Sequence, residues 1–313
     1  MKKIIVYNPY NVFSLYKLFL FYSILKVTFG KAELIKKILP ENLYYYLRTK
    51  IIKKNVAKYE KTDITLFKNV EIETINRCNN TCGFCPVNKK QDIRTFKRME
   101  EGLFNRIIDQ LSDINYSGEI AFHSNNEPLL DNDLANKIAY THKKCPDAFL
   151  YFYTNGILLN AEMVLKFKKS GIQKIVVNNY NNKKKLHKNI ENLINELNKL
   201  QDVDYPQIVI IIRELNEILN NRGGNSPNKP NSHFNHYKYF QDVPCSLPFE
   251  KLVIRPDGKV SLCSQDAYGE ITLGDTNKSS LVEIWQGKPF EKIRKTLINN
   301  GRKRLPLCEI CDY

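Results

Sequence analysis

Three cysteines lie close together in the first third of the chain and could hold a metal centre. Cys78, Cys82 and Cys85 have the spacing C-x3-C-x2-C, with Gly83 between the last two. Thiolates this close in sequence can surround one compact metal site when the loop curls round it. Three ligands leave one iron of a four-iron cluster open for a small molecule, whereas a closed zinc or iron-sulfur site needs a fourth. A zinc knuckle and a redox cysteine cluster remain alternatives.

Four more cysteines lie in the last quarter of the chain and could hold a second metal centre. They are Cys245, Cys263, Cys308 and Cys311. The stretch 251–262 carries a Pro-Asp-Gly turn between two apolar segments and predicts a β-hairpin flanked by the first two cysteines. Zinc ribbons and 4Fe-4S sites can both be built on a hairpin and a C-x2-C pair, so spacing alone leaves both open. Cys145 stands apart and is interpreted as a spare thiol.

The first cysteine loop, with Phe84 directly before its last cysteine, resembles the signature of the radical S-adenosylmethionine (SAM) superfamily. The segment 258–263, with the pattern G-x4-C, resembles the SPASM/twitch extension found in part of that family. The resemblance implies two 4Fe-4S clusters, one that binds SAM at its open iron and one auxiliary cluster with four protein ligands. Reductive cleavage of SAM in that family yields a 5'-deoxyadenosyl radical that abstracts hydrogen.

The resemblance also assigns cofactor contacts. The segment 123–130 (HSNNEPLL) resembles the family's GGEPLL segment, so Glu127 is expected to hold the methionine amino group of SAM. Asn125 and Asn126 replace the two glycines, and asparagine tolerates positive φ better than other residues with a side chain. Asn155 lies in a Thr-Asn-Gly segment that resembles the family's TNG or is an ordinary turn. Asn178 occupies the position of a ribose contact.

Three further residues have polar side chains suited to the cofactor or the substrate. Arg213 could bind the SAM carboxylate with two hydrogen bonds, or it could pair with Glu214 or Glu217. Arg222 begins a Gly/Asn-rich loop and could clamp a substrate phosphate or hydroxyl, although the loop could be only a linker. Asp266 could accept a hydrogen bond from a substrate hydroxyl, or it could be a turn residue.

Alternating helical and strand patterns predict the fold that positions these residues. Strands are expected at 70–74, 119–123, 149–153, 174–177 and 207–213, with a short sixth strand at 217–220. Helices are expected at 99–111, 134–143, 161–170 and 186–200. This order predicts an α/β fold, a partial (β/α)6 TIM-like barrel with ligands at the carboxyl ends of its strands. We place the barrel at residues 66–240 and the small auxiliary-cluster domain at 241–313.

Residues 1–65 form a basic extension in which we expect two or three amphipathic helices. The most apolar stretch, 12–29, is interrupted by Lys17 and Lys26 and is short for a membrane span. The stretch 32–59 has helical spacing and is broken at Pro40. The extension could pack on the barrel, bind a partner, or contact a membrane surface through residues 12–59.

The formal net charge is +15, mostly from lysines scattered through Asn-rich sequence. No nucleic-acid-binding motif accompanies this charge, and we expect no nucleic-acid partner. Clustered cysteines in a chain of 313 residues favour metal ligation in a reducing compartment, and therefore the cytoplasm.

These features predict a radical SAM oxidoreductase. It would abstract hydrogen from a polar substrate, such as a sugar-like or cyclitol-like alcohol, and its auxiliary cluster would accept the remaining electron. The first cluster would require an external donor of the flavodoxin or ferredoxin type. Two alternatives stay open: a radical enzyme that matures a peptide substrate, and a zinc-stabilised binding module.

Overall fold

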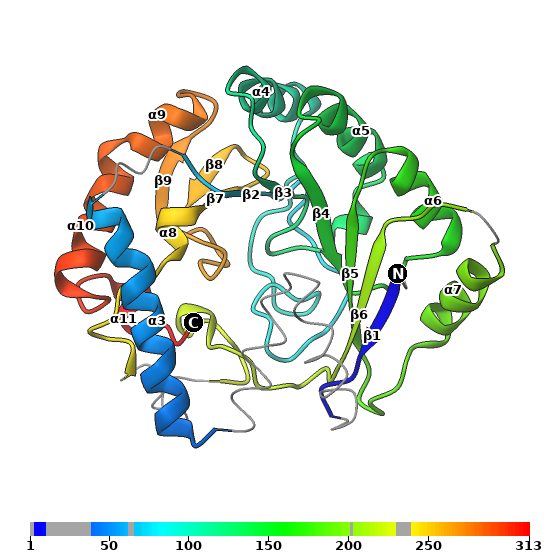
Figure 1. The fold of residues 1–313 in the computed structure, drawn as a ribbon, viewed down its shortest axis with the longest axis horizontal. Coiled ribbons are helices and arrows are strands. Elements are labelled where there is room, and N and C mark those ends of the chain that lie inside the picture. The colour runs from blue at the N-terminus through cyan, green and yellow to red at the C-terminus, as the bar shows by residue number, and fades with distance from the viewer. Residues whose placement is uncertain (1–2, 11–38, 62–65, 201–202, 230–238) are drawn as a thin grey trace.

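The computed structural model describes residues 3–10, 39–61, 66–200, 203–229 and 239–313. A curved sheet of nine strands runs through these segments in the order β1-β6-β5-β4-β3-β2-β7-β8-β9. Figure 1 shows the sheet lining the inside of the molecule, with most helices on its outer side. All pairs from β1 to β7 are parallel, and β7, β8 and β9 pair antiparallel. This arrangement confirms the predicted α/β fold with a TIM-like parallel sheet.

The strands alternate with helices along the chain, as the sequence pattern predicts. The strands are β1 (Ile4–Tyr7), β2 (Asn69–Ile72), β3 (Glu119–Ala121), β4 (Phe149–Thr154), β5 (Lys174–Tyr180), β6 (Gln207–Arg213), β7 (Lys251–Ile254), β8 (Lys259–Ser261) and β9 (Thr272–Asp275). The helices are α3 (Glu41–Lys61), α4 (Glu101–Asp113), α5 (Leu134–Lys144), α6 (Ala161–Lys169), α7 (Lys188–Lys199), α8 (Leu247–Glu250), α9 (Leu281–Gln286), α10 (Lys288–Asn300) and α11 (Pro306–Glu309), with short 3-10 turns at Pro128–Leu130 and Arg222–Gly224.

Side chains on each strand alternate between the helix-covered face and the inner face of the sheet. Val70 and Ile72 of β2 pack with the helices in the main core, as do Leu252 and Ile254 of β7. The residues between them therefore face inward, because successive side chains of a strand point to opposite faces. The inner face thus receives polar residues of β2, β3 and β7, which positions them for chemistry.

Two predictions about the edges of the sheet are wrong. Residues 217–220 form no strand, and the strand beside β6 is β1, which belongs to the extension predicted to be helical. The β1 residues Ile4–Tyr7 are apolar enough to pair with the buried β6. The pairing could not be predicted from the sequence, because β1 lies far from the barrel strands along the chain. Helix α3 confirms the helical pattern at 41–59, whereas the predicted helix at 12–29 lies outside the described residues.

Candidate functional site

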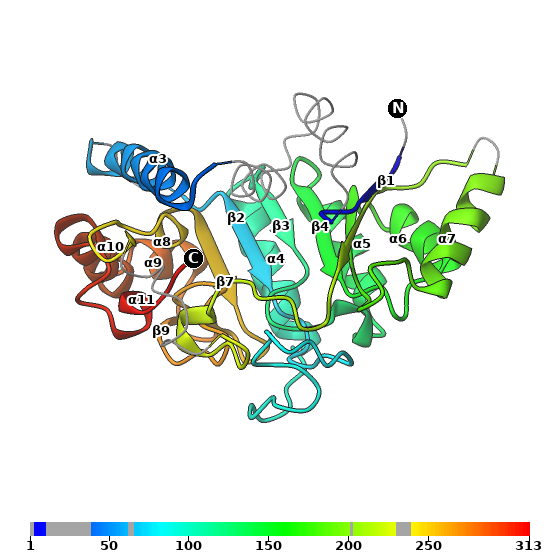
Figure 2. The ribbon, with the colours of Figure 1, turned by 90° about the horizontal axis from the view of Figure 1, so that it is seen from below.

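The first cysteine loop lies beyond the carboxyl end of β2, where Figure 2 shows the cyan loops at one end of the sheet. The loop is fixed by its own hydrogen bonds. The Cys85 N–H donates to the Cys82 carbonyl at 3.1 Å, and the Asn88 amide donates to the carbonyls of Cys82 at 3.0 Å and Cys85 at 2.8 Å. The Asn80 N–H points at the Cys78 sulfur at 3.4 Å. Asn88 was not predicted from sequence, although it directly follows the motif.

The loop also packs against the end of β5 and the segment that follows β6. Gly83 approaches so closely that a Cβ there would lie 2.5 Å from the Asn216 side-chain oxygen. Phe84 is 3% exposed and its ring lies 5.5 Å from that of Tyr180. The Ser226 hydroxyl donates to the Phe84 carbonyl at 2.9 Å. The predicted cofactor residue Phe84 is therefore part of the loop's support.

The three thiols of this loop are in an environment that suits metal ligation. Burial raises the pKa of Cys78 to about 12 and raises the pKa of Cys85, against the lowering effect of the Arg222 charge. Burial also raises the pKa of Cys82, and the charges of Cys85 and Cys78 add to this rise. A metal replaces the thiol proton and removes this penalty. In the described residues, no three His, Cys, Asp or Glu side chains are grouped closely enough to hold a single metal ion.

Glu127 joins the ends of β3 and β4 beside this loop. Its carboxylate accepts hydrogen bonds from the Thr154 hydroxyl at 2.7 Å, the Asn155 N–H at 2.7 Å and the Leu129 N–H at 3.2 Å. Burial raises the pKa of Glu127 to about 7, against these hydrogen bonds. The Asn155 amide in turn donates to the Asn79 side chain at 2.7 Å and lies 3.9 Å from the Cys78 sulfur. The structure thus brings the predicted residues Glu127 and Asn155 together at the cysteine loop.

The two asparagines that replace the family's glycines do not need positive φ. The residues other than glycine with positive φ are Asn115, Lys184 and Arg222, among those described. Neither Asn125 nor Asn126 has positive φ, so the tolerance of asparagine for that conformation does not explain the turn. Instead, the Asn125 amide donates to the Ser264 carbonyl at 3.2 Å, a contact that glycine could not make.

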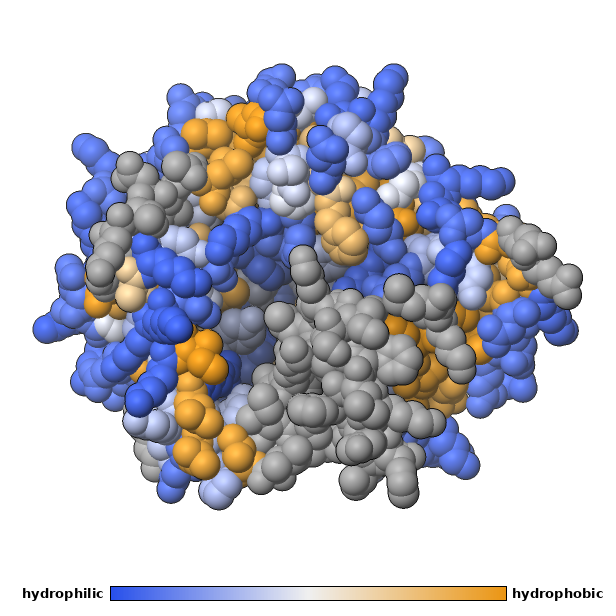
Figure 3. All heavy atoms as spheres, viewed as in Figure 1, coloured by the Kyte–Doolittle hydropathy of each residue, from blue (hydrophilic) through white to orange (hydrophobic). Residues whose placement is uncertain are grey.

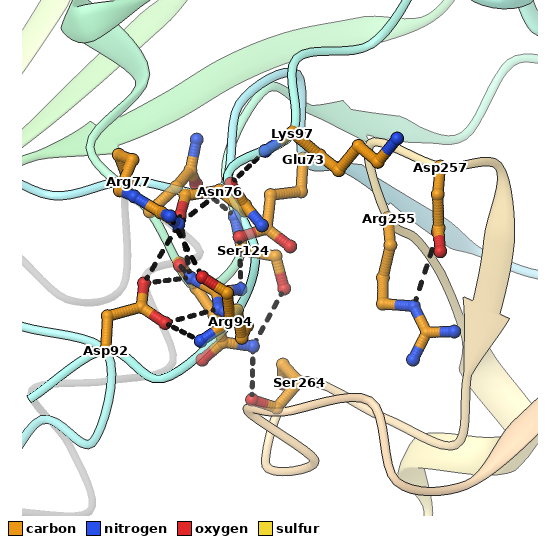
Figure 4. Close-up of polar contacts among 12 residues, drawn as sticks. Glu73, Asn76, Arg77, Asp92, Arg94, Lys97, Ser124, Arg255, Asp257 and Ser264 are labelled. Atoms are coloured by element: carbon orange, nitrogen blue, oxygen red, sulfur yellow. Dashed lines mark hydrogen bonds and ion pairs between the residues drawn. The ribbon is translucent and has the colours of Figure 1, made fainter.

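Arg94 holds the main chain of this turn and was not predicted from sequence. Figure 4 shows it among Asp92, Glu73 and the turn. It binds both carboxylate oxygens of Asp92, at 3.0 and 2.9 Å, and one of Glu73 at 2.9 Å. It also donates to the Asn125 carbonyl at 2.8 Å. A buried bidentate arginine fixes geometry as well as charge, so Arg94 sets the position of the turn expected to contact SAM.

Arg213 and Asn178 lie together at the ends of β6 and β5. Arg213 Nε donates to Asn178 Oδ1 at 3.3 Å, and Nη1 lies 3.1 Å from both carboxylate oxygens of Glu217. The structure therefore shows the ion-pair alternative, with Glu217 rather than Glu214. Contacts of Arg213 and Asn178 with SAM stay predictions.

The second cysteine set comes from the segment before α8, the chain after β8, and α11 with the residues that follow it. Burial raises the pKa of Cys263, and the charges of Cys245, Cys308 and Cys311 add to the effect. The other three thiols therefore lie near enough to Cys263 for their charges to act on it. Four cysteines gathered in one region supply the number of donors that a fully ligated cluster requires.

Asp266 and Arg222 are placed between the two cysteine sets. The Asp266 oxygens accept hydrogen bonds from the N–H groups of Glu270 at 2.8 Å and Ile271 at 3.0 Å, so the structure gives this residue the turn role. Arg222 Nη1 donates to the Ser264 carbonyl at 3.4 Å, next to Cys263. The charge of Arg222 also opposes the rise that burial causes in the pKa of Cys85. The structure shows what each side chain binds within the protein, and contacts of Arg222 and Asp266 with a substrate stay predictions.

The loop after β6 contacts both cysteine sets. Ser226 binds the first loop through Phe84, as described above. At the other set, the Asn221 N–H donates to Asp312 Oδ1 at 2.7 Å, and Lys229 forms a buried ion pair with Asp312 Oδ2. A Cβ on Gly223 would lie 2.8 Å from Leu307, so this position needs glycine both for space and for its φ of 60°. The linker alternative is therefore not what the structure shows.

The inner face of the sheet has an apolar half and a polar half. Tyr7, Val176, Val209 and Ile211 form the apolar half on β1, β5 and β6. The polar half contains an ion pair between Lys251 of β7 and Glu71 of β2, and Ser124 donates to the second oxygen of Glu71 at 2.9 Å. Although burial alone would raise it, the Lys251 charge keeps the pKa of Glu71 below its ordinary value.

His123 lies beside this pair. The Tyr153 N–H donates to His123 Nδ1 at 3.2 Å, and the two rings are 4.6 Å apart. Burial lowers the pKa of His123 to about 4, against the opposing effect of Glu71. The ring is therefore neutral at pH 7, and the hydrogen bond at Nδ1 assigns its proton to Nε2. His123 and Lys251 thus present hydrogen-bond donors on the inner face.

Comparison with known families identifies the class. Residues 72–212 match the model of the radical SAM superfamily, and residues 245–312 match SPASM, an iron-sulfur cluster-binding domain. The chain belongs to the radical SAM superfamily and is a radical SAM enzyme with two iron-sulfur sites. These matches decide against the zinc alternatives that the cysteine spacings leave open.

The individual relatives are more specific. Over 249 residues the chain is 27% identical to the S-adenosyl-L-methionine-dependent 2-deoxy-scyllo-inosamine dehydrogenase of Niallia circulans, covering 79% of this chain and 93% of that protein. A crystal structure of BtrN in complex with AdoMet and 2-DOIA has a TM-score of 0.67 and 27% identity, covering 79% of this chain and 94% of BtrN. An open conformation of BtrN has a TM-score of 0.59 at 23% identity, covering 80% and 94%, which supports the fold alone.

The residues present fit the cofactors of this class. Cys78, Cys82 and Cys85 supply three thiolates, which leaves an iron for SAM, and the other four cysteines supply a closed set. Glu127, Asn155 and the turn held by Arg94 surround the first loop. We therefore assign SAM and one 4Fe-4S cluster to the first loop and the auxiliary 4Fe-4S cluster to the second set.

Proposed function

We propose that this protein dehydrogenates a secondary alcohol of a small cyclitol or aminocyclitol. When bound, the cofactors supply a 5'-deoxyadenosyl radical for hydrogen abstraction and an auxiliary cluster that accepts an electron. The alcohol gives its C–H hydrogen atom to the 5'-carbon, its hydroxyl proton to the medium and one electron to the auxiliary cluster, and it becomes a ketone. That electron balances the one consumed in cleaving SAM, so the overall reaction needs no further oxidant.

The polar half of the inner face carries this proposal. A substrate with several hydroxyl or amino groups needs a partner for each buried polar atom, because an unpaired one costs about 1–3 kcal/mol. Lys251, His123 and Ser124 offer such partners on one wall. Arg222 offers another between the two cysteine sets. The apolar half on β5 and β6 suits the carbon ring and excludes water from the radical.

The test uses enzyme reconstituted anaerobically with iron and sulfide, then given SAM, dithionite and 2-deoxy-scyllo-inosamine deuterated at ring carbons. We expect 5'-deoxyadenosine to carry deuterium from one position and to form in a 1:1 ratio with a ketone. Inositols and a precursor-like peptide serve as comparison substrates. Formation of 5'-deoxyadenosine without deuterium from any cyclitol would contradict the proposal. The variant with Cys78, Cys82 and Cys85 changed to Ala is the control and should form none.

We also propose that an acidic flavodoxin or ferredoxin reduces the first cluster. The net charge of +15 would attract such a carrier over a long range. The rate of reduction should therefore fall steeply as salt is raised from low to physiological ionic strength. A rate independent of salt would speak against an electrostatically guided carrier.

Helix α3 supports a peripheral contact with an anionic lipid surface. Leu43, Leu47 and Ile51 recur every fourth residue and are 42%, 40% and 60% exposed. Figure 3 shows hydrophobic side chains in this region of the molecule. In the described part of the chain, no helix has the length and apolar character needed to cross a membrane. Cosedimentation with phosphatidylserine vesicles, lost when these three residues are changed to Ser, would support the contact; equal sedimentation of the variant would exclude it.

The free state of all eight cysteines fits a reducing compartment, and we propose the cytoplasm. Oxidation-sensitive labelling of the thiols in intact cells would test this placement. Disulfides among the seven clustered cysteines in freshly lysed cells would contradict it.

A further inference from the structure

Arg302 is a buried cation beside the auxiliary cysteines. It is 1% exposed, and its guanidinium group donates to the carbonyls of Cys311 at 3.1 Å and Val243 at 3.3 Å. The group also lies 5.0 Å from the centre of the Phe240 ring. These partners are neutral, so they satisfy hydrogen bonds without balancing the charge.

Throughout the described segments, no Asp or Glu lies within ion-pair distance of Arg302. The carboxylate of Asp312, close by in sequence, is paired with Lys229 and Asn221. The carboxylate of Asp266 is bound by two backbone N–H groups. An unpaired charge in a protein interior is costly, and proteins retain one where an anion or a metal site balances it.

The nearest candidates for that anion are the cysteines. Arg302 donates to the carbonyl of Cys311, one of the four cysteines of the second set, so its guanidinium group lies beside the expected ligand shell. Four thiolates around a four-iron cluster leave a net negative charge, and this charge grows when the cluster accepts an electron. At low dielectric, a nearby cation then stabilises the reduced form more than the oxidised form.

We propose that Arg302 is the built-in countercharge of the auxiliary cluster and raises its reduction potential, making the cluster a better acceptor of the substrate electron. Arg302 contacts neither substrate nor SAM in this scheme, so it is a positioning residue that acts through the cluster. The inference rests on the assignment of the auxiliary cluster but not on the identity of the substrate. Its test therefore requires no turnover.

Arg294 offers a matched control in the same domain. It is also buried, at 6% exposed, and it donates only to carbonyls, those of Pro248 at 2.9 Å and Trp285 at 2.7 Å. Its guanidinium lies 4.0 Å from the centre of the Trp285 ring. Burial lowers the pKa of Arg294 to about 10, and its side-chain hydrogen bonds within the described residues reach no cysteine. Loss of Arg294 should affect folding without affecting the cluster.

The experiment measures the midpoint potential of the auxiliary cluster by electron paramagnetic resonance during a redox titration. The full-length chain carries Cys78→Ala, Cys82→Ala and Cys85→Ala, so that one cluster remains. We compare this background with Arg302→Met, Arg302→Lys and Arg294→Met. Arg302→Met should shift the potential to more negative values by a tenfold change in the equilibrium constant or more, about 59 mV for one electron. Arg302→Lys should restore most of the potential, and Arg294→Met should leave it unchanged.

An unchanged potential in Arg302→Met, or an equal shift in Arg294→Met, would overturn the proposal. If Arg302→Met does not retain iron, Arg302→Lys and Arg302→Gln decide by the same measurement, because Lys keeps the charge and Gln removes it. Equal potentials in the Lys and Gln variants would then contradict a role of charge. These potentials can be interpreted even if the dehydrogenase proposal fails, because none of the measurements depends on a substrate.

Discussion

At the scale of single residues, the cysteines are predictable because metal ligands are set by residue type and close spacing. The residues that hold them are not. Asn88 and Arg94 bind carbonyls of the loop and of the turn that follows β3, and these partners exist only once the chain has folded. Arg213 shows the same limit. Its two candidate partners, Glu214 and Glu217, lie three positions apart in sequence, and only the path of the loop after β6 places Glu217 against Arg213.

His123 carries a prediction at this scale. Its pKa in the folded protein, about 4, lies below the ordinary value of about 6.5. The contribution of the neutral ring to the unfolding free energy is therefore fully present above pH 6.5 and is lost as pH falls toward 4. At pH 5 the loss amounts to about 2 kcal/mol. His123→Gln should remove this part of the pH dependence, measured as the difference in urea unfolding free energy between pH 7 and pH 5.

The charged and titratable groups that face His123 come from three strands, and they define the comparison. They are Glu71 of β2, Lys251 of β7, and the phenols of Tyr151 and Tyr153 on β4. Of these, none titrates between pH 5 and pH 7 when Lys251 remains paired with Glu71. The same loss between pH 7 and pH 5 in the native protein and in His123→Gln would show that the ring is not a buried neutral group.

At the scale of elements, the alternation of helices and strands is readable from periodicity, whereas the ends of elements depend on what they meet. Helix α10 ends at Asn300 and is capped by Gly301, whose φ is 63°. The next residue, Arg302, donates its N–H to the Gln241 carbonyl at 2.8 Å. This contact joins the end of α10 to the segment before Cys245. The sequence shows the glycine, but only the fold shows how closely the backbone of Gln241 approaches it.

Gly301→Ala tests this junction. A Cβ would lie 2.4 Å from the Gln241 carbonyl oxygen and 2.9 Å from the Asp242 backbone, and the positive φ adds strain. We expect a loss of at least about 2 kcal/mol in unfolding free energy and reduced iron at the auxiliary site. Gly102→Ala, in the first turn of α4 with no atom within 4 Å, is the control and should be neutral or slightly stabilising. Equal melting temperatures for the two variants would contradict the close contact between Gly301 and the backbone of Gln241 and Asp242.

At the scale of the whole molecule, the three proposed domains share one sheet. Strand β7 of the auxiliary domain pairs with β2 of the barrel, with Asn69 opposite Lys251, and β1 of the extension pairs with β6. Helix α3 of the extension packs near α10. The boundaries at 65 and 240 stay predictions about sequence organisation, while the shared sheet predicts that barrel and auxiliary domain unfold together.

The ion pair between Lys251 and Glu71 tests this coupling, since it joins the two domains across β2 and β7. Lys251→Met leaves the buried Glu71 carboxylate with the Ser124 hydroxyl as its one hydrogen-bond partner among the described residues, and should cost about 3 kcal/mol. The double variant Glu71→Met with Lys251→Met removes both charges and should recover most of this loss. Differential scanning calorimetry measures both variants. A single variant as stable as the native protein would mean that the pair does not hold the domains together.

The sequence by itself determined the two cysteine sets, the parallel α/β pattern and the membership in a radical enzyme class, because these depend on local spacing and on strand and helix periodicity. Only the tertiary structure decided that Asn125 reaches Ser264, that β1 completes the sheet edge, and that Arg302 is buried beside Cys311. These are contacts between residues far apart in sequence or on different elements. Their energies come from burial and hydrogen bonding, which exist only after the chain has packed.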